Sequence, residues 1–548
     1  MPLKVQLPNL TLCVIARDEE AMLGGCLASV AGIADELVVV DTGSTDRTVE
    51  IARAAGAKVV HFAWCDDFAA ARNAALPHVT GDWILVLDAD ERLIPGAGPP
   101  IRQFIGRGDV DLGLLPLYGA SRVDATLEEV LQGSARQGSV VLLPRLLRRT
   151  PDLAWQGVVH EHVVGWLRER THRIQPLQAP IVHYGAAPSL RKQRLKTERN
   201  LRLLHRRLEL EPDEPAVLLH LAGEHEKLGD AAASKEYTQR SWETLCRVFA
   251  TRKPAPSVVE PATMMARVHL LAGNPKPALD VLHQAFTWGA EHPNLRFLEG
   301  RAFELRGEQA TSLVDRSSFF ESALERYQQC AALKNNVFTE EMLNGVTTWL
   351  SELRFARTLL HLDRPNDALA VYQRVWTESS RPEGLYGQVE AHIRLGDPQR
   401  GLSLLQPVLS QNKREAWVFA ASAHESVGDF DKMSKCLAHA RGEDAWSFPE
   451  AQWLFGELNA AFSLYRGAPL PGKTTSAVLG ALLFRKPVEG PVPFVRWRHS
   501  LVLANLLRSQ RRMDYRALLE PNADQVAPGL VEATQAYFEG LGIPVARL

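Results

Sequence analysis

The chain has 548 residues, with 62 basic and 64 acidic side chains and a formal net charge of −2 at pH 7. This balance gives no electrostatic reason to expect a nucleic-acid partner or an anionic membrane surface. Apolar residues make up 46% of the chain, as in an ordinary soluble protein, and no apolar run reaches the length of about 18 residues that spans a membrane. Six cysteines lack C-x-x-C spacing and no secretory signal opens the sequence, so we predict a cytoplasmic protein without disulfides.

Apolar runs and helical patterns alternate in the N-terminal part of the chain. Strands are predicted at 10–16, 36–40, 58–62 and 83–87, and helices at 22–30, 48–55 and 67–74. This alternation predicts a mostly parallel sheet of the α/β class. Arg17, Asp41 and Asp88 follow or end three of the strands, so we expect them at one edge of the sheet, where ligands of open α/β sheets bind.

A cluster of acids ends the most apolar of these runs. Asp88 and Asp90 lie two positions apart at the carboxyl end of the predicted strand, so in an extended chain their side chains leave from one face. Two carboxylates can hold a cation such as Mg²⁺ or Mn²⁺, whose open positions bind diphosphate oxygens. The alternative is a solvated strand-to-loop junction, because acids are common in turns and D-x-D alone is a weak motif.

Four motifs follow one another in this region: ARDEE, DELVVVDTGSTDRT, DFAAARNAAL and GDWILVLDADE. In this order they resemble the nucleotide-sugar half of glycosyltransferase family 2, which has a GT-A fold. The similarity continues through PRLLR at 144–148, WQGVVHE at 155–161, IVHYG at 181–185 and KTERN at 196–200. This series is similar to a subgroup in which tetratricopeptide-like (TPR-like) helices follow the transferase, including bacterial peptide S-glycosyltransferases and lipopolysaccharide-core-type transferases. One departure is Asp18, where many relatives carry asparagine.

The resemblance implies which side chains bind the donor. Asp41 is expected to accept hydrogen bonds from the nucleotide base, and Asp88 and Asp90 to take the ribose and the metal. Arg72 is a candidate for the diphosphate, because a guanidinium suits phosphate oxygens, but it is equally an ordinary charge on a helix surface. The donor-binding set is Arg17, Asp41, Arg72 and Asp88.

The resemblance also implies a metal and a base. The metal-ligand set is Asp88, Asp90 and His183, with Mg²⁺ or Mn²⁺ as cofactor. His183 matches the place where many GT-A enzymes supply a third ligand, and its alternative is a buried histidine bonded to the backbone. Inverting transfer also needs a base for the acceptor's proton. Glu161 in WQGVVHE is the candidate, because similar enzymes place the acceptor-side acid there; its neighbours His160 and His162 are either structural or take part.

Beyond residue 189 the pattern is helical. A basic, amphipathic run leads into it, which we interpret as a connecting helix with a solvated face. Gly273 and Gly307 are 34 residues apart and Gly396 and Gly428 are 32 apart, close to the tetratricopeptide period of about 34. Helix-to-helix turns are predicted at Gly229, Gly273, Gly307, Leu362, Gly396 and Gly428. The expected α-solenoid binds a protein or peptide, or serves as a structural extension or dimer surface.

We therefore predict four segments: a GT-A domain at 1–189, a connecting basic helix at 190–212, a TPR-like α-solenoid at 213–465 and a C-terminal helical segment at 466–548. One string in the last segment, GAPLPGKT at 467–474, fits the Walker A pattern. Two prolines remove N–H donors that a phosphate loop needs, so we interpret this string as a linker.

Three functions are compatible with these observations. The favoured one is a metal-dependent, inverting hexosyltransferase that moves a sugar from a nucleotide diphosphate donor, with UDP favoured, to a protein, peptide or glycan acceptor. A nucleotidyltransferase is disfavoured, because no glycine- and lysine-rich phosphate loop follows the first strand. A catalytically weak scaffold, whose solenoid mediates protein binding or self-association, is disfavoured because Asp88, Asp90 and Glu161 are all present.

Overall fold

The computed structural model describes residues 8–459, apart from 133, 168–172, 187–192, 252–257, 311–312, 337, 339, 341, 412, 428, 443–450, 453 and 457. The chain divides into two compact units. The first comprises Met1–Val268, Val281–Leu295 and Asn335–Gly345, and the second His269–Asp280, Arg296–Lys334 and Val346–Leu548. The C-terminal segment 466–548 and the Walker-like string 467–474 lie outside the described residues. The predicted domain boundaries at 189, 212 and 465 stay predictions.

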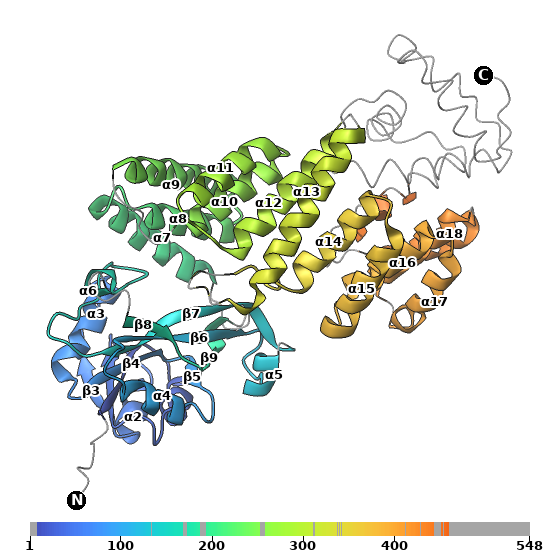
Figure 1. Ribbon diagram of the computed structural model, residues 1–548. Coiled ribbons are helices and arrows are strands. Elements are labelled where there is room, and N and C mark those ends of the chain that lie inside the picture. The colour runs from blue at the N-terminus through green and yellow to red at the C-terminus, as the bar shows by residue number, and fades with distance from the viewer. Residues whose placement is uncertain are drawn as a thin grey trace, which may run out of the picture. The chain divides into compact units, whose positions relative to one another are not determined.

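A mostly parallel sheet forms the core of the first unit (Figure 1). In the described residues its strands are β1 (Leu10–Ala16), β2 (Glu36–Asp41), β3 (Lys58–His61), β4 (Trp83–Asp88), β5 (Glu91–Leu93), β6 (Leu112–Ala120), β7 (Arg136–Arg148), β8 (Ile174–Pro176) and β9 (Ile181–His183). Their order is β3-β2-β1-β4-β7-β6-β9-β5, with β8 beside β6. β3, β2, β1 and β4 run parallel, whereas β7 is antiparallel to β4 and β6. The predicted α/β class is confirmed.

Helices cover both faces of this sheet. The connecting helices are α1 (Leu23–Ser29), α2 (Thr48–Ala54), α3 (Phe68–Ala75), α4 (Gly98–Ile105), α5 (Leu127–Gln132) and α6 (Val164–Leu167). On β1, Leu12 and Val14 join the cluster that contains α1 and α4, whereas Cys13 joins the cluster that contains α3. Burial on both faces explains the uninterrupted apolar runs. Each fully buried valine or leucine side chain contributes about 1.5–3 kcal/mol to the stability of the fold.

The rest of the described chain is helical: α7 (Gln193–Leu210), α8 (Pro215–Lys227), α9 (Ala231–Thr251), α10 (Val259–Leu271), α11 (Pro275–Thr287), α12 (Pro293–Gln309), α13 (Leu313–Ala332), α14 (Trp349–His361), α15 (Pro365–Ser379), α16 (Pro382–Arg394), α17 (Pro398–Leu409), α18 (Arg414–Ser426) and α19 (Phe430–Ala440). Sequential helices pack as pairs, for example α8 on α9 (Figure 1). The helices α18 and α19 form another such pair. This confirms the predicted TPR-like region. None of the described helices is long and apolar enough to cross a membrane.

The predicted turn glycines divide into two kinds. Gly229, Gly273 and Gly396 have φ of 77°, 74° and 78°, in the left-handed region that ends helices, so these turns are confirmed. Gly307 was predicted as a turn, and that prediction is wrong, because it lies inside α12. A Cβ at 307 would come within 2.8 Å of the Phe320 ring, so this glycine lets α12 and α13 approach closely. Gly428 lies outside the described residues.

Candidate active site

Polar residues meet where the parallel strands end. In the register of the sheet, Asp41 lies opposite Ala16 and Asp88 lies opposite Ile15, so β1, β2 and β4 finish side by side. Arg17 follows directly, and its side chain is more than half exposed. The predicted shared edge is therefore present, and the donor-binding role of Arg17 stays a prediction.

Two guanidinium groups hold the carboxylate of Asp88. Arg72 Nη2 donates to Oδ1 at 3.0 Å, and Arg145 Nη2 donates to Oδ2 at 3.3 Å. Although burial opposes ionisation, Arg145 and Arg72 together hold the pKa of Asp88 well below its ordinary range. Asp88 is therefore ionised at neutral pH, and both of its oxygens already have cationic partners.

Arg72 also pairs with Glu161. Its Nε lies 2.5 Å from Glu161 Oε1, and the two side chains are only 10% and 14% exposed. The helix α3 holds Arg72 in this place, since the side chain of Asp67 caps its N-terminus and the backbone N–H of Phe68 donates to Val158 O at 2.9 Å. Arg72 is thus not an ordinary surface charge. The attraction of Glu161 and Asp88 overcomes burial and raises the pKa of this guanidinium.

Glu91 and Arg145 form a buried pair that the sequence interpretation gave no role. Glu91 is 1% exposed, accepts the backbone N–H of Asp88 at 3.0 Å and lies 2.5 Å from Arg145 Nη2. Burial raises the pKa of Glu91 to about 7, against the attraction of Arg145. The pair orders the turn after β4. In the sequence, the only indication of this pair is an arginine within the apolar strand β7, since an arginine buried in a sheet requires a partner for its charge.

Asp90 and His183 lie next to each other beyond that turn. Asp90 Oδ2 is 3.4 Å from His183 Nε2, and Glu91 faces His183 across the β5–β9 pair. A Cβ at Gly185 would collide with the Asp90 carboxylate and lie 2.8 Å from His183 Nε2, so the glycine keeps this space open. An oxygen and an imidazole nitrogen suit a divalent cation such as Mn²⁺. Hydrogen bonding to Asp90 raises the pKa of His183 despite burial.

Asp41 closes the turn after β2. Its carboxylate accepts the backbone N–H of Ser44 at 3.0 Å and lies 3.2 Å from His61 Nδ1. Gly43, at φ 102°, permits this tight turn. Although burial raises it, these hydrogen bonds hold the pKa of Asp41 below its ordinary value. The side chain is thus a fixed acceptor at the sheet edge, and its contact with a nucleotide base stays a prediction.

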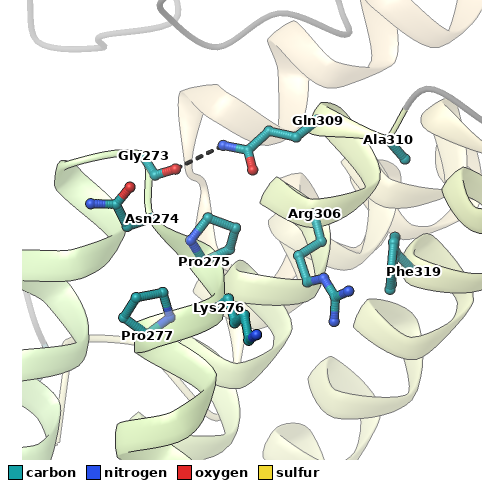
Figure 2. Close-up of a pocket in the computed structure, with 9 residues that line it drawn as sticks. All are labelled: Gly273, Asn274, Pro275, Lys276, Pro277, Arg306, Gln309, Ala310 and Phe319. Carbon is teal, nitrogen blue, oxygen red and sulfur yellow. Dashed lines mark hydrogen bonds between the residues drawn. The ribbon is translucent and has the colours of Figure 1, made fainter. Parts of the chain in front are cut away.

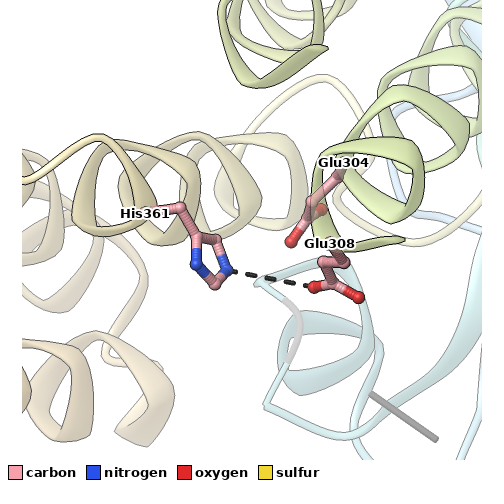
Figure 3. Close-up of side chains that lie close together, drawn as sticks. All are labelled: Glu304, Glu308 and His361. Atoms are coloured by element: carbon pink, nitrogen blue, oxygen red, sulfur yellow. Dashed lines mark ion pairs between the residues drawn. The ribbon is translucent and has the colours of Figure 1, made fainter. Parts of the chain in front are cut away.

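A second group of acids and a histidine lies in the second unit (Figure 3). Glu308 Oε1 is 3.9 Å from His361 Nε2, beside Glu304. The carboxylate of Glu304, however, accepts a hydrogen bond from Tyr327 Oη at 2.7 Å and forms an ion pair with Arg354. Because cationic and hydroxyl donors already occupy Glu304, this cluster stabilises the packing of α12, α13 and α14 and is a poor metal site.

A pocket of about 360 Å³ also lies in the second unit (Figure 2). The guanidinium of Arg306 lies over the Phe319 ring at 4.0 Å, and Gln309 Nε2 donates to Gly273 O at 2.8 Å. The lining residues are Gly273, Asn274, Pro275, Lys276, Pro277, Arg306, Gln309, Ala310 and Phe319, which include two cations and no acid. This pocket lacks the acids that sugar transfer requires.

A protein-family model matches the part of the chain that contains the sheet edge. Residues 11–161 match the family model described as "Glycosyl transferase family 2". The N-terminal part of this chain is therefore a glycosyltransferase family 2 domain, and it contains Arg17, Asp41, Arg72, Asp88 and Glu161.

Two curated relatives extend the likeness beyond that domain. A TPR repeat-containing protein of Synechococcus elongatus is 37% identical over 248 residues, which cover 44% of this chain and 58% of that protein. The SPbeta prophage-derived glycosyltransferase SunS of Bacillus subtilis is 25% identical over 240 residues, which cover 43% of this chain and 54% of that protein. The chain thus spans a little over half the length of these relatives.

Solved structures of two kinds show a low similarity to this chain. Glucosyl-3-phosphoglycerate synthase from Mycobacterium tuberculosis, solved with Mn²⁺, UDP and glucosyl-3-phosphoglycerate, is 20% identical, covers 36% of this chain and 78% of that chain, and has a TM-score of 0.26. A TPR protein of Thermus thermophilus is 15% identical, covers 41% of this chain and 98% of that chain, and has a TM-score of 0.29. Overlaps this low carry no argument about function.

Proposed function

We propose that this chain is a glycosyltransferase that moves a sugar from a nucleotide diphosphate donor, UDP-linked, to a protein, peptide or glycan acceptor with inversion. The observation that carries the proposal is the position of Arg72. Its guanidinium bridges Asp88, at the donor edge of the sheet, and Glu161, on the segment assigned to the acceptor side. A guanidinium group that contacts both carboxylates is a suitable partner for the diphosphate oxygens of a bound donor.

Asp90 and His183 are the residues that would hold the proposed Mg²⁺ or Mn²⁺. Such a cation, when bound, neutralises charge on the departing nucleoside diphosphate. Asp88 contributes in a different way, because Arg72 and Arg145 already occupy both of its oxygens. We therefore assign Asp88 to the ribose, with Asp41 as an acceptor for the base, and place the metal at Asp90 and His183.

Glu161 is the proposed base, and its pairing with Arg72 defines a resting state. While the guanidinium lies 2.5 Å from Oε1, it occupies that oxygen of the Glu161 carboxylate. Donor phosphates are competing anions for Arg72. In our proposal they draw the guanidinium away from Glu161, whose carboxylate then accepts the acceptor's proton as the sugar transfers.

A donor screen tests this function. Purified protein is incubated with UDP-glucose, UDP-galactose, UDP-N-acetylglucosamine or GDP-mannose, and the release of nucleoside diphosphate is measured with Mg²⁺, Mn²⁺ or chelator. We expect release from one UDP-sugar, lost on chelation and in Asp90→Asn. Asp124→Asn, an acid with an 81% exposed side chain, is the matched control. Absence of release from every UDP-sugar would contradict the proposal.

We further propose that the repeats bind the acceptor or a protein partner. The pocket beside α11, α12 and α13 supports this, because Lys276 and Arg306 line it without an acidic lining residue (Figure 2). In the double variant Lys276→Glu/Arg306→Glu, transfer of radiolabelled sugar into host proteins should fall while donor hydrolysis is unchanged. Lys435→Glu, on the exposed side of α19, should change neither. Equal loss of hydrolysis in the double variant would overturn this role.

A further inference from the structure

Arg207 of α7 reaches the segment that carries Glu161. Its side chain is 4% exposed, and Nη1 donates to the carbonyl oxygens of Val159 at 2.9 Å and His160 at 3.3 Å. Its Nη2 lies 3.1 Å from His162 Nε2. One guanidinium therefore contacts the residues immediately before and after Glu161. Glu211, one turn further along the chain, pairs with Arg207 at 3.1 Å and orients it.

The backbone of this segment needs such support. His160 has a φ of 52°, which is rare for a residue with a side chain, and such conformations persist only where the surroundings impose them. Gly157, at φ 92°, leaves room for Arg207, whose Cζ would lie 3.1 Å from a Cβ there. Gln156 and His162 close the loop with paired backbone hydrogen bonds of 2.8 and 2.9 Å.

The next helix braces the same segment. The His160 ring stacks on His220 of α8, with ring centres 3.9 Å apart and planes inclined by 18°. Burial lowers the pKa of both imidazoles, so they stack as neutral rings. Val158 and Val159 pack in one cluster with residues of both helices, namely Leu203, Leu204, Val217 and Leu221. The helices α7 and α8 thus form the wall against which this loop is folded.

The basic helix also contacts the loop before α3. Arg202 pairs with Asp66, and the Arg199 guanidinium lies 5.3 Å from the centre of the Phe68 ring. Phe68 begins the helix that carries Arg72. The prediction that the charged side chains of this helix form a solvated face is therefore wrong for Arg207, which is 4% exposed, whereas Arg199 is half-buried and Arg202 is 62% exposed. The buried guanidinium of Arg207 is stable here because two carbonyl oxygens and the Glu211 carboxylate accept its N–H groups.

We infer that Arg207 is a positioning residue for the proposed transfer reaction, acting through the Val159–His160 backbone to aim Glu161 at the acceptor. The inference rests on the proposed function and deepens it. It makes α7 and α8 part of the working site, although they follow the family 2 domain in sequence. A displaced base costs turnover without weakening the donor contacts at Asp41, Asp88 and Asp90.

The experiment compares Arg207→Met with Arg207→Lys and a control in the full-length protein. UDP release from the active UDP-sugar gives kcat and KM, and calorimetry gives the affinity for UDP. We expect Arg207→Met to lower kcat about 10- to 100-fold, with KM and UDP affinity within about twofold of the parent protein. Arg207→Lys keeps one cationic donor and should recover part of kcat. Arg240→Met, on α9 with a 46% exposed side chain, should leave all three values unchanged.

Two further measurements separate positioning from general damage. In the Glu161→Gln background, adding Arg207→Met should cost kcat less than about twofold, because both changes remove the same base. Hydrogen exchange of residues 156–162 should accelerate in Arg207→Met and not in Arg240→Met. Unchanged exchange in Arg207→Met, or a kcat loss that is fully additive with Glu161→Gln, overturns the inference. If the parent protein releases no UDP, the proposed function fails, whereas the exchange result still decides whether Arg207 orders the loop.

Discussion

The Nε of Arg72 lies 2.5 Å from Glu161 Oε1, although 89 positions separate the two residues in the chain. The same guanidinium donates to Asp88 at 3.0 Å. One side chain therefore links Asp88, the proposed donor-binding residue, to Glu161, the proposed base. In the proposed function this link favours donor binding before proton removal from the acceptor.

The first prediction concerns the proposed base. Glu161→Gln keeps the shape of the side chain and a carbonyl oxygen for Arg72, but it does not take a proton. Donor binding should survive, and transfer should fall by about 10²- to 10⁴-fold. Calorimetry measures whether UDP affinity survives, and initial rates of UDP release measure the fall in transfer. Asp152→Asn, which changes an exposed acid earlier in the same segment of the chain, is the control, and a loss in that variant alone would move the base to Asp152.

The second prediction concerns the metal. His183→Ala should remove most of the effect of Mn²⁺ on donor affinity, because it deletes the nitrogen 3.4 Å from Asp90 Oδ2. Thermal unfolding with and without Mn²⁺ gives an activity-free measure, since a bound cation stabilises only the folded state. His78→Ala, at the end of a short helical turn, should retain the shift. An undiminished Mn²⁺ shift in His183→Ala would place the cation elsewhere.

The third prediction concerns the space beside those ligands. Gly185→Ala puts a Cβ against the Asp90 carboxylate and the His183 ring, so metal-dependent donor affinity should fall at least tenfold while the fold is kept. Gly223→Ala is the matched control, because a Cβ at that helical position meets nothing within 4 Å. This control should be neutral or stabilise the protein by up to about 1 kcal/mol. Equal donor affinities in the two variants would show that Gly185 is not needed for an open site.

The fourth prediction concerns pH and the second unit. Burial and the nearby Glu304 raise the pKa of Glu308 to about 7, whereas Arg357, Arg301 and Arg316 oppose the rise (Figure 3). Because the folded pKa exceeds the unfolded value of about 4.5, the contribution of Glu308 to stability is fully present below pH 4.5 and is lost as pH rises through 7.

Glu308→Gln mimics the protonated form. Relative to the parent protein, this variant should therefore gain stability between about pH 4.5 and 7.5, by at most about 3 kcal/mol. Urea unfolding at several pH values measures the difference. Burial lowers the pKa of the neighbouring His361, so the titration of this histidine also changes stability with pH. Because His361 is present in both proteins, its contribution largely cancels when their stabilities are subtracted. Parallel stability curves for the two proteins would show that folding does not raise the pKa of Glu308.

The parallel strands could be located from the sequence almost to the residue. The predicted strands at 10–16 and 83–87 correspond to Leu10–Ala16 and Trp83–Asp88 in the structure. Their signal is local, because a strand buried on both faces is a continuous apolar run, and the acids that follow mark its carboxyl end. The helical character of the remaining chain, and the glycines of its turns at 229, 273 and 396, are local signals of the same kind.

Only the tertiary structure decided which charged side chains are buried together. Arg72, Arg145 and Arg207 stand on three separate elements, and although Arg145 lies within an apolar strand, nothing in the sequence around the three arginines identifies their partners. The sheet brings Arg145 to Glu91, α3 brings Arg72 to Glu161, and α7 folds back so that Arg207 reaches the backbone beside that acid. Burial makes each pairing obligatory, because an ion removed from water requires a partner, and that partner is chosen by distance in space and not by distance along the chain.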